Sequence, residues 1–380
     1  MQKTLTTTAL ATLLALGATA ASAEIRIGAS VSATGPAAFL GDPEAKTLEM
    51  LVEQINENGG INGEEIALTL YDDGGDPNKA RTFATRLIED DEVVAIIGGS
   101  TTGTSMSILS VAEDNEIPFI SLAGAIEIID PVKPFTFKTP HTDRMACQKI
   151  FEDMQKRQIT TIGMISGTDG FGASMQAQCK DVVGEYGITV AADETYNPTD
   201  ADMTTQLTKI RNTEGVQAVL NPGFGQGPSI VTRNYRQLAI DLPLYQSHGV
   251  ASDGFIELAG AEAAEGVRLP GTALLIADQL PEGDPQKPVV DAYKTAFEEK
   301  TGTSVGTFGG YAHDAFLILT DAITRAGSAE PQAIRDAIES TSGLAGTTGI
   351  YTMSADNHLG LDLSAFRMLE IKGGEWTVVE

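Results

Sequence analysis

Alternating and continuous runs of apolar residues predict short strands and amphipathic helices in turn over the first third of the chain. The expected strands are residues 24–29, 65–71, 93–98 and 118–121, and the expected helices are residues 42–58, 77–90 and 104–116. Turn residues agree with these bounds, since Asn58-Gly59-Gly60 closes the first helix and Asp76-Pro77 opens the second. This rhythm is typical of right-handed βαβ units, so we expect a parallel sheet covered by helices.

The same rhythm restarts after Pro140 and indicates a second unit of the same kind. Its expected helices are residues 143–157, 172–186, 202–213 and 227–238, and its expected strands are residues 161–166, 188–192, 216–221 and 244–246. Helices resume at residues 287–300, 311–326 and 331–340, and strand-like segments follow at residues 365–371 and 375–379. We therefore expect two doubly wound units in tandem, with the last two strands docked on the second.

The first 23 residues differ from the rest of the chain. Lys3 is their only charged residue, an apolar centre spans residues 9–20, and Ala21-Ser22-Ala23 precedes the acidic Glu24. This is the pattern that signal peptidase cleaves, and the apolar centre is too short to span a bilayer. We expect residues 1–23 to be a cleavable signal peptide that directs export from the cytoplasm.

Length and charge narrow the function classes. A chain of 380 residues is longer than one hydrophobic core usually organises, which favours two domains. Its 52 acidic and 25 basic residues give a net charge of −27, spread along the whole chain rather than gathered in runs. Because such a surface repels nucleic acid and anionic lipid, we expect neither of them as a partner.

The chain has two cysteines, Cys147 and Cys179. Both fall in expected helices that flank one strand, and disulfides persist in the compartments that exported proteins reach. A bridge between them is therefore geometrically feasible, and two separate buried thiols are the alternative.

Residues with reactive or metal-binding side chains form no familiar catalytic pattern. The four histidines stand apart from one another and from the cysteines, without the spacing that metal sites use; they are His141, His248, His313 and His358. The chain also lacks a GxSxG nucleophile motif and a recognisable Ser/His/Asp grouping. We expect a protein that is not an enzyme and that needs no metal or cofactor.

Several motifs along the chain are informative through their order and spacing. In the first third they are Thr34-Gly-Pro, Ile55-Asn-Glu-Asn-Gly-Gly-Ile-Asn-Gly, Tyr71-Asp-Asp-Gly-Gly-Asp-Pro, Ile97-Gly-Gly-Ser-Thr-Thr and Ile117-Pro-Phe-Ile-Ser-Leu-Ala. Further along they are Asp169-Gly-Phe-Gly and Gly310-Tyr-Ala-His-Asp-Ala. With these motifs, essentially the whole chain after residue 23 resembles the periplasmic leucine/isoleucine/valine-type solute-binding proteins of ABC transporters.

The resemblance implies an α/β fold of two doubly wound, Rossmann-like lobes joined by three hinge crossovers, the type I periplasmic binding protein or Venus-flytrap architecture. It assigns residues 24–140 and 270–349 to the first lobe, and residues 141–269 and 350–380 to the second. It further implies a monomer in the periplasm that closes on a small carboxylate and delivers it to an inner-membrane ABC permease. The alternative is a ligand-sensing receptor subunit for a membrane kinase or chemoreceptor.

Candidate ligand-binding residues lie where expected strands end. Residues 100–104 follow the strand that ends at Gly98 and open a helix, so their hydroxyls and amides suit a carboxylate, although plain helix capping uses the same residue types. The resemblance favours the carboxylate role, with Ser100, Thr102 and Ala125 as anchors, and it supplies apolar walls from both lobes. The full candidate set is Phe39, Leu40, Ser100, Thr101, Thr102, Ala123, Gly124, Ala125, Phe171, Phe224, His248 and Phe308.

His248 departs from the family pattern, because branched-chain amino-acid binders carry a glutamate at the matching place to receive the ligand's ammonium group. An imidazole lacks that fixed negative charge; it donates a hydrogen bond, and when protonated it prefers an anionic partner. Either the ligand is a carboxylate without an α-ammonium group, such as a benzoate-like aromatic acid or a keto acid, or Asp143 takes the ammonium. The third interpretation is that His248 is a loop residue whose ring interacts only with neighbouring residues and does not bind the ligand. Phenylalanines at positions where the family has tyrosines favour an apolar or aromatic ligand body.

Overall fold

The first of two parallel sheets is built by the N-terminal part of the chain in the computed structural model, which describes residues 24–379. The signal peptide expected at residues 1–23 lies outside the described residues. The strands of this sheet are β1 (Ile25–Val31), β2 (Ile66–Asp72), β3 (Ala95–Gly98), β4 (Phe119–Ser121) and β5 (Thr136–Lys138). Their order is β2-β1-β3-β4-β5, and every neighbouring pair is parallel.

The helices around the first sheet come from both ends of the chain. They are α1 (Ala38–Glu57), α2 (Pro77–Glu89), α3 (Thr102–Asp114), α11 (Thr307–Ala326) and α12 (Pro331–Glu339). Side chains of α11 and α12 share one apolar core with the strands, so these two C-terminal helices complete the first lobe. A small antiparallel pair, β11 (Leu344–Ala345) and β12 (Ile350–Tyr351), follows α12.

The second sheet repeats the first and adds two strands. Its strands are β6 (Thr161–Gly167), β7 (Thr189–Tyr196), β8 (Ala218–Asn221), β9 (Leu244–Gln246), β10 (Arg268–Gly271), β13 (Arg367–Lys372) and β14 (Glu375–Val378). Their order is β14-β13-β10-β9-β8-β6-β7, in which β13 and β14 are antiparallel to their neighbours and the other pairs are parallel. Its helices are α4 (Asp143–Lys156), α5 (Gly170–Val182), α6 (Thr204–Asn212), α7 (Gln226–Gln237), α8 (Asp253–Ala259) and α9 (Ala261–Ala264). The expected α/β fold of two doubly wound lobes is confirmed.

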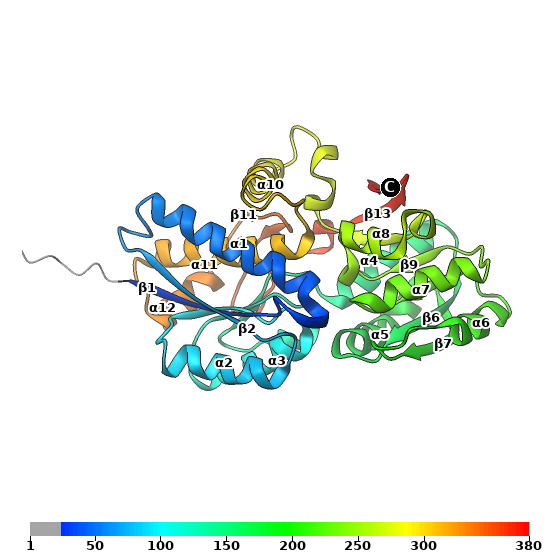
Figure 1. Cartoon of the computed structure of the whole chain (residues 1–380), viewed down its shortest axis with the longest axis horizontal. Coiled ribbons are helices and arrows are strands. Elements are labelled where there is room, and N and C mark those ends of the chain that lie inside the picture. Colours follow the sequence, from blue (N-terminus) through cyan, green and yellow to red (C-terminus); the bar gives the residue numbers. More distant parts are fainter. Residues whose placement is uncertain (1–23, 380) are drawn as a thin grey trace, which may run out of the picture.

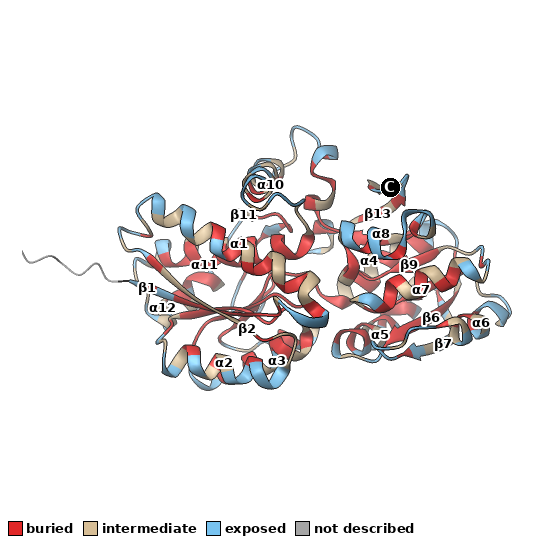
Figure 2. Cartoon of the chain, viewed as in Figure 1, coloured by how far each residue is buried: buried red, intermediate tan, exposed pale blue. Residues whose placement is uncertain are grey.

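The two lobes lie side by side along the longest axis, and the chain passes between them three times (Figure 1). The first passage joins β5 to α4, the second runs from β10 through α10 (Lys287–Thr301) to α11, and the third joins β12 to β13. Buried residues gather on the strands and on the inner faces of the helices in each lobe (Figure 2). Tyr351 and Ala365 still pack in the first core, so the third passage falls near Phe366, later than the boundary at residue 349 that we expected.

Four strands and two short helices of the structure were not expected from the sequence, namely β5, β10, β11, β12, α8 and α9. β5 is three residues long and includes Lys138, whose charge masks an otherwise buried strand. β10 contains Pro270, a residue that normally argues against a strand inside a sheet because it has no N–H to donate.

Two helices begin four residues earlier than expected, because small residues allow close packing at their first turns. α1 begins at Ala38 instead of residue 42 and carries Pro43 inside the helix. α11 begins at Thr307 instead of residue 311, although Gly309 and Gly310 weaken the helical pattern. A Cβ on Gly310 would lie 2.8 Å from the Thr347 hydroxyl, so the glycines serve packing. These earlier starts place three candidate residues on helices: Phe39, Leu40 and Phe308.

Candidate ligand-binding site

A small cavity of about 40 Å³ lies between the lobes, at the carboxyl ends of strands from both sheets. Ligands of open parallel sheets bind at this edge. The cavity is lined by Leu40, Ser100, Thr101, Thr102, Leu122, Ala123, Gly124, Pro140, Phe171, Phe224, His248, Gly249, Phe308 and Tyr311. It shares Thr101, Thr102, Phe171 and Phe224 with a wider cleft of about 670 Å³ that opens outward between the lobes.

Ten of the twelve candidate residues line this cavity; Phe39 and Ala125 do not. Ala125 is fully buried behind the wall, and Phe39 contacts wall residues from outside. Sequence reasoning missed Leu122, Pro140, Gly249 and Tyr311, which also line the cavity. Leu122 and Gly249 adjoin candidate residues in the sequence, so extending each candidate loop by one residue would have found them.

The first turn of α3 forms a polar wall on the first lobe. Thr101 caps the helix: its hydroxyl accepts from the Thr104 amide at 3.2 Å, and its amide donates to the Thr104 hydroxyl at 3.1 Å. The next hydroxyl, on Thr102, is buried, lines the cavity and has no hydrogen-bond partner among the described residues. The first amides of an α-helix also have no partner within the helix. Thr101 is therefore used for helix capping, whereas the hydroxyl of Thr102 is not.

Ser100 is held by neighbours on both sides. Its Oγ accepts from the Ser32 amide at 2.9 Å and is hydrogen-bonded to the carboxyl group of Glu44 on α1. Glu44 is fully buried, and burial raises the pKa of its carboxyl well above the usual value. Sequence reasoning missed Glu44, although it interrupts the apolar stripe formed by Leu40 and Leu48 at helical spacing.

The turn at Gly124 is fixed from behind and lets the second lobe approach. Lys138 Nζ donates to the Gly124 carbonyl at 2.9 Å, and the Asp143 amide donates to the same carbonyl at 3.0 Å. Burial lowers the pKa of Lys138 to about 7. A Cβ on Gly124 would lie 2.9 Å from both His248 Nε2 and the Phe171 ring, so a side chain here would push the second lobe away.

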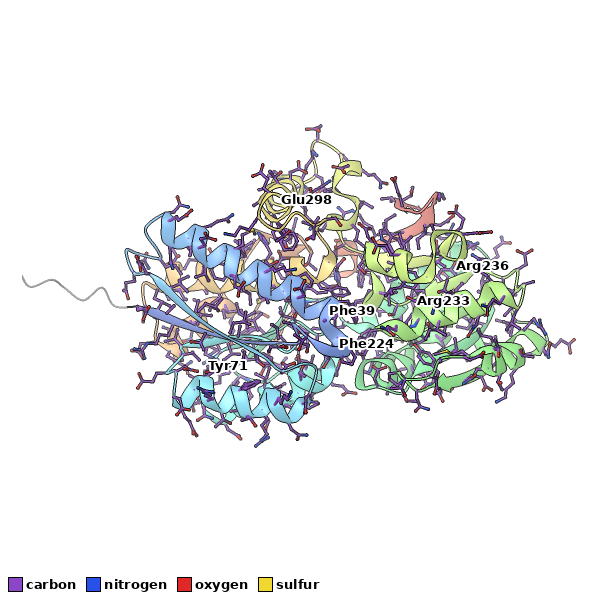
Figure 3. The ribbon with its side chains drawn as sticks, in the orientation of Figure 1. Phe39, Tyr71, Phe224, Arg233, Arg236 and Glu298 are labelled. Carbon is purple, nitrogen blue, oxygen red and sulfur yellow. A yellow bond between two sulfur atoms is a disulfide. The ribbon has the colours of Figure 1, made fainter. Side chains whose placement is uncertain are left out.

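Aromatic rings form the opposite wall. Phe171 makes edge-to-face contacts with Phe224, at 6.1 Å between ring centroids, and with His248, at 5.4 Å. Phe39 of the first lobe lies 6.2 Å from Phe224 and 5.6 Å from Phe308. Figure 3 shows Phe39 and Phe224 facing each other where the lobes meet. The ring of Phe39 therefore bridges the two lobes at the edge of the cavity.

His248 is buried, and neither ring nitrogen makes a hydrogen bond of normal geometry with another described residue. Burial, with a smaller effect of the Lys138 charge, lowers the pKa of His248 to about 3, although the His141 backbone opposes this shift. The imidazole is therefore neutral near pH 7 and offers one N–H donor and one acceptor. The expectation that a protonated His248 attracts an anion does not hold at neutral pH, because the ring is desolvated.

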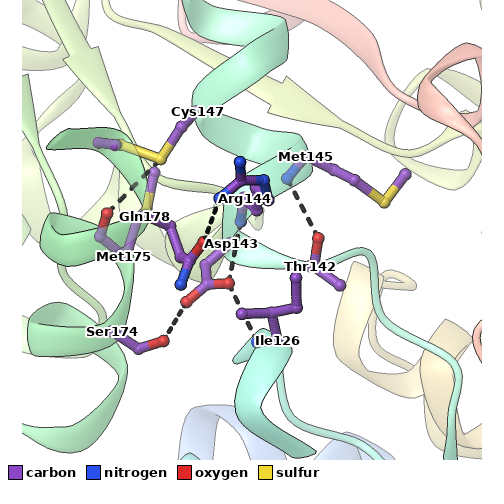
Figure 4. Close-up of a disulfide and its surroundings, with 10 residues drawn as sticks. Ile126, Thr142, Asp143, Arg144, Met145, Cys147, Ser174, Met175 and Gln178 are labelled. Carbon is purple, nitrogen blue, oxygen red and sulfur yellow. Dashed lines mark hydrogen bonds between the residues drawn. A yellow bond between two sulfur atoms is a disulfide. The ribbon is translucent and has the colours of Figure 1, made fainter. Parts of the chain in front are cut away.

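Asp143 does not line the cavity. Its carboxylate accepts from the Ile126 amide at 3.0 Å, from the Arg144 amide at 2.9 Å and from the Ser174 hydroxyl (Figure 4). Burial raises the pKa of Asp143. With Asp143 engaged elsewhere, no Asp or Glu within residues 24–379 lines the cavity.

A disulfide joins Cys147 on α4 to Cys179 on α5, with a Cα–Cα distance of 5.1 Å (Figure 4). Of the two alternatives for these cysteines, the structure contains the bonded one. The bridge fixes together two helices whose first turns carry Asp143 and Phe171. It therefore supports the second-lobe side of the cavity from behind.

Two further features bear on the function class. In the part of the chain that the structure describes, no three or more His, Cys, Asp and Glu side chains are grouped so that they could hold a metal ion. No helix between residues 24 and 379 combines the length and apolar character needed to cross a bilayer.

Comparison with known proteins gives a consistent result. The family described as "Periplasmic binding protein" matches residues 24–375. The chain is 27% identical to the leucine-, isoleucine-, valine-, threonine- and alanine-binding protein of Pseudomonas aeruginosa over 83% of this chain and 82% of that protein. An extracellular ligand-binding receptor from Rhodopseudomonas palustris HaA2 superposes with a TM-score of 0.87 at 29% identity, covering 94% of this chain and all of that one. The branched-chain amino acid transporter substrate-binding protein LivJ of Streptococcus pneumoniae, solved with isoleucine, shares the fold with a TM-score of 0.83 at 21% identity, covering 94% and 99% of the two chains.

Proposed function

Because the chain belongs to the periplasmic binding protein family, we propose that it is the substrate-binding component of an ABC importer for a small carboxylate with an apolar or aromatic body and no α-ammonium group. Members of this family are periplasmic solute-binding proteins rather than enzymes. The signal peptide expected at residues 1–23 would deliver the protein to the periplasm.

The proposed ligand class rests on one observation. One wall of the cavity carries hydrogen-bond donors, the opposite wall carries aromatic rings, and neither wall contains an acidic residue. The unpartnered hydroxyl of Thr102 and the first turn of α3 suit a carboxylate. Phe171, Phe224 and Phe308 suit a planar or branched apolar group. An ammonium group enclosed here would lack a counter-charge, and the cost of burying an unpaired charge opposes amino acids.

Closure of the lobes is the mechanism that we propose for capture. The first lobe supplies ten of the fourteen wall residues and the second lobe supplies four, so a ligand that contacts both lobes favours the closed arrangement over the open one. The permease then recognises the closed shape. His248 completes the pocket as a neutral donor or acceptor for a carbonyl or carboxylate oxygen.

Calorimetric titration with a matched panel tests the ligand class. The probes are benzoate, 4-methyl-2-oxopentanoate and leucine; the last two share a branched body and differ by a keto group in place of the ammonium group. We expect the keto acid or benzoate to bind at least about tenfold more tightly than leucine, which corresponds to about 1.4 kcal/mol. Benzamide, which lacks the carboxylate charge, is the control and should bind weakly. Tighter binding of leucine would overturn the proposed ligand class.

A further inference from the structure

We propose that Glu44, in its protonated form, positions Ser100 as a hydrogen-bond donor, so that a carboxylate binds in the cavity only while a proton is held behind the cavity wall. Glu44 itself does not line the cavity, but its carboxyl group reaches Ser100, which does. The inference rests on the proposed function only in taking a carboxylate as the ligand.

Glu44 has an unusual environment for an acidic residue. It lies on the inner face of α1 between Leu40 and Leu48 and is fully buried. One carboxyl oxygen is bonded to Ser100, and the other is buried without a hydrogen-bond partner among the described residues. A carboxylate in this position would be desolvated and would receive a single hydrogen bond, which is far less than a buried negative charge requires.

The groups around Glu44 do not compensate a negative charge. Asp73, at the end of β2, is the charged group whose field reaches Glu44, and it raises the pKa of Glu44 further. Asp73 is itself engaged by the hydroxyls of Ser30, at 2.9 Å, and Ser32, at 2.7 Å. On α11, the Tyr311 hydroxyl is buried without a partner among the described residues, and burial, with smaller effects of Asp314 and Glu44, raises the pKa of that phenol. With an acid and a neutral phenol facing it, Glu44 is stable in the neutral form.

Protonation of Glu44 determines the direction of the hydrogen bonds around Ser100. An ionised Glu44 accepts a hydrogen bond from Ser100 Oγ; a protonated carboxyl group instead has one O–H to donate, and Ser100 Oγ is the group within hydrogen-bond reach of it. Ser100 Oγ has two lone pairs, one for the Ser32 amide and one for the Glu44 O–H. The hydrogen of Ser100 is then free for an oxygen atom in the cavity.

Ionisation of Glu44 reverses this arrangement. Ser100 must then donate its hydrogen to the carboxylate, and the cavity loses a donor. A negative charge also appears one residue behind the place where the ligand carboxylate binds, and like charges repel. Binding of a carboxylate and protonation of Glu44 therefore favour each other, and affinity falls about tenfold for each pH unit above the pKa of Glu44.

Titrations of wild type and Glu44→Gln between about pH 5 and pH 10 test this coupling. The probes are benzoate, 4-methyl-2-oxopentanoate and leucine, since all three carry a carboxylate. In Glu44→Gln the amide donates to Ser100 at every pH, so we expect an affinity like that of wild type at low pH and a flat profile above it. Glu49→Gln, at an exposed position on the same helix, should keep the wild-type profile.

The outcomes separate this inference from the proposed ligand class. If leucine binds tightly and the other probes do not, the proposed ligand class is wrong. The dependence of leucine affinity on pH in wild type and Glu44→Gln then still tests the role of Glu44. Identical profiles for wild type and Glu44→Gln would overturn that role. If none of the three probes binds, both proposals fail.

Two measurements cover the case in which Glu44→Gln folds poorly. Ser100→Ala removes the donor that Glu44 positions, so it should bind the same probes at least about tenfold more weakly at low pH and show a smaller decline above it, because the charge repulsion alone remains. Infrared spectra of ligand-free wild type at neutral pH should contain the carbonyl band of a protonated buried acid that resists deuterium exchange. The absence of that band, or wild-type affinity at low pH in Ser100→Ala, would contradict the proposal.

Discussion

The hydroxyl groups around the cavity differ in whether they already have a hydrogen-bond partner in the protein. Ser100 and Thr101 are engaged with Glu44 and Thr104, respectively. The hydroxyls of Thr102 and Tyr311 are buried without partners among the described residues. Since an unpaired buried hydroxyl costs free energy, a ligand that supplies the missing partner gains that much affinity.

Thr102→Val removes one of these hydroxyls and keeps the shape of the side chain. We expect the affinity for the tightest-binding probe of the carboxylate panel to fall about tenfold or more, because hydrogen bonds to charged groups contribute about 1.5–3 kcal/mol. Stability of the ligand-free protein should be unchanged, because the hydroxyl has no partner to lose. Thr82→Val, exposed on α2, is the control and should leave affinity unchanged. Unchanged affinity in Thr102→Val would remove Thr102 from the site.

His248 predicts a pH dependence of stability. The unfolded chain protonates this histidine near its ordinary pKa of 6.5, whereas burial lowers the pKa of His248 to about 3 in the folded protein. The unfolded state therefore binds more protons between these values, and the free energy of unfolding falls as the pH drops from about 6.5 towards 3.

Urea unfolding of wild type and His248→Gln over this pH range isolates the contribution of His248. The difference in the free energy of unfolding between the two proteins should change by up to about 1.4 kcal/mol per pH unit, with wild type losing the stability. Parallel losses in the two proteins would contradict this account.

At the residue scale, sequence reasoning found most of the cavity and missed what lies behind it. Loops after strands identify Ser100, Thr102 and Phe171, because parallel sheets bring such loops to one edge. The roles of Glu44 and Lys138 depend on which atoms they reach across the fold. No local pattern carries that information.

Among the secondary-structure elements, the contact of α1 with the loop after β1 determines where the candidate residues of the first lobe lie. A Cβ on Gly41 would lie 2.6 Å from the Ala33 amide nitrogen and would overlap the Ser32 carbonyl group. The absence of a side chain lets the first turn of α1 press against this loop. Leu40 thereby lines the cavity, and Phe39 reaches Phe224.

Gly41→Ala should lower the free energy of unfolding by about 1–3 kcal/mol or more, because the added methyl meets backbone atoms that cannot rotate away. Urea denaturation measures this change. Gly184→Ala is the control, since a Cβ there meets nothing within 4 Å, and it should leave stability unchanged or slightly higher. Equal stability of Gly41→Ala and wild type would mean that α1 can shift away from the loop.

Element prediction succeeded where the apolar pattern was strong and failed where packing overrides it. The strands and helices of the two βαβ series were expected with bounds close to those of the structure. β5 and β10 were missed because Lys138 and Pro270 contradict the strand pattern locally. Only the surrounding sheet, which the sequence does not display, makes those residues acceptable there.

For the whole molecule, the aromatic bridge of Phe39 and Phe224 links the lobes where the cavity meets the outer cleft. Phe39 belongs to the first lobe and Phe224 to the second, so their contact is made when the lobes are together. Phe39 thereby adds a contact that favours the closed arrangement although, unlike Phe224, it does not line the cavity.

Phe39→Ala should weaken binding of the tightest carboxylate probe by about three- to tenfold, because aromatic pairs contribute about 0.5–1.5 kcal/mol beyond buried area. Titration calorimetry measures the affinity, and small-angle scattering should show less compaction at equal probe concentration. Phe83→Ala removes a ring that stacks on Tyr71 within the first lobe and should leave affinity unchanged. A similar loss in both variants would point to general destabilisation instead.

The starts of α3 and α5 lie opposite each other across the gap, where a Cβ on Gly170 would be 3.6 Å from the Thr102 side chain. Asp169 occupies the start of α5, where its side chain accepts from the amides of Phe171 and Gly172, both at 3.0 Å. The start of α3 carries no acidic residue. The site therefore has an electropositive helix N-terminus on one lobe and an apolar wall on the other. A ligand with one charged and one apolar end fits in a single orientation. Under the proposed function, we expect the carboxylate to bind first to the N-terminal lobe and the second lobe then to close over the apolar end of the ligand.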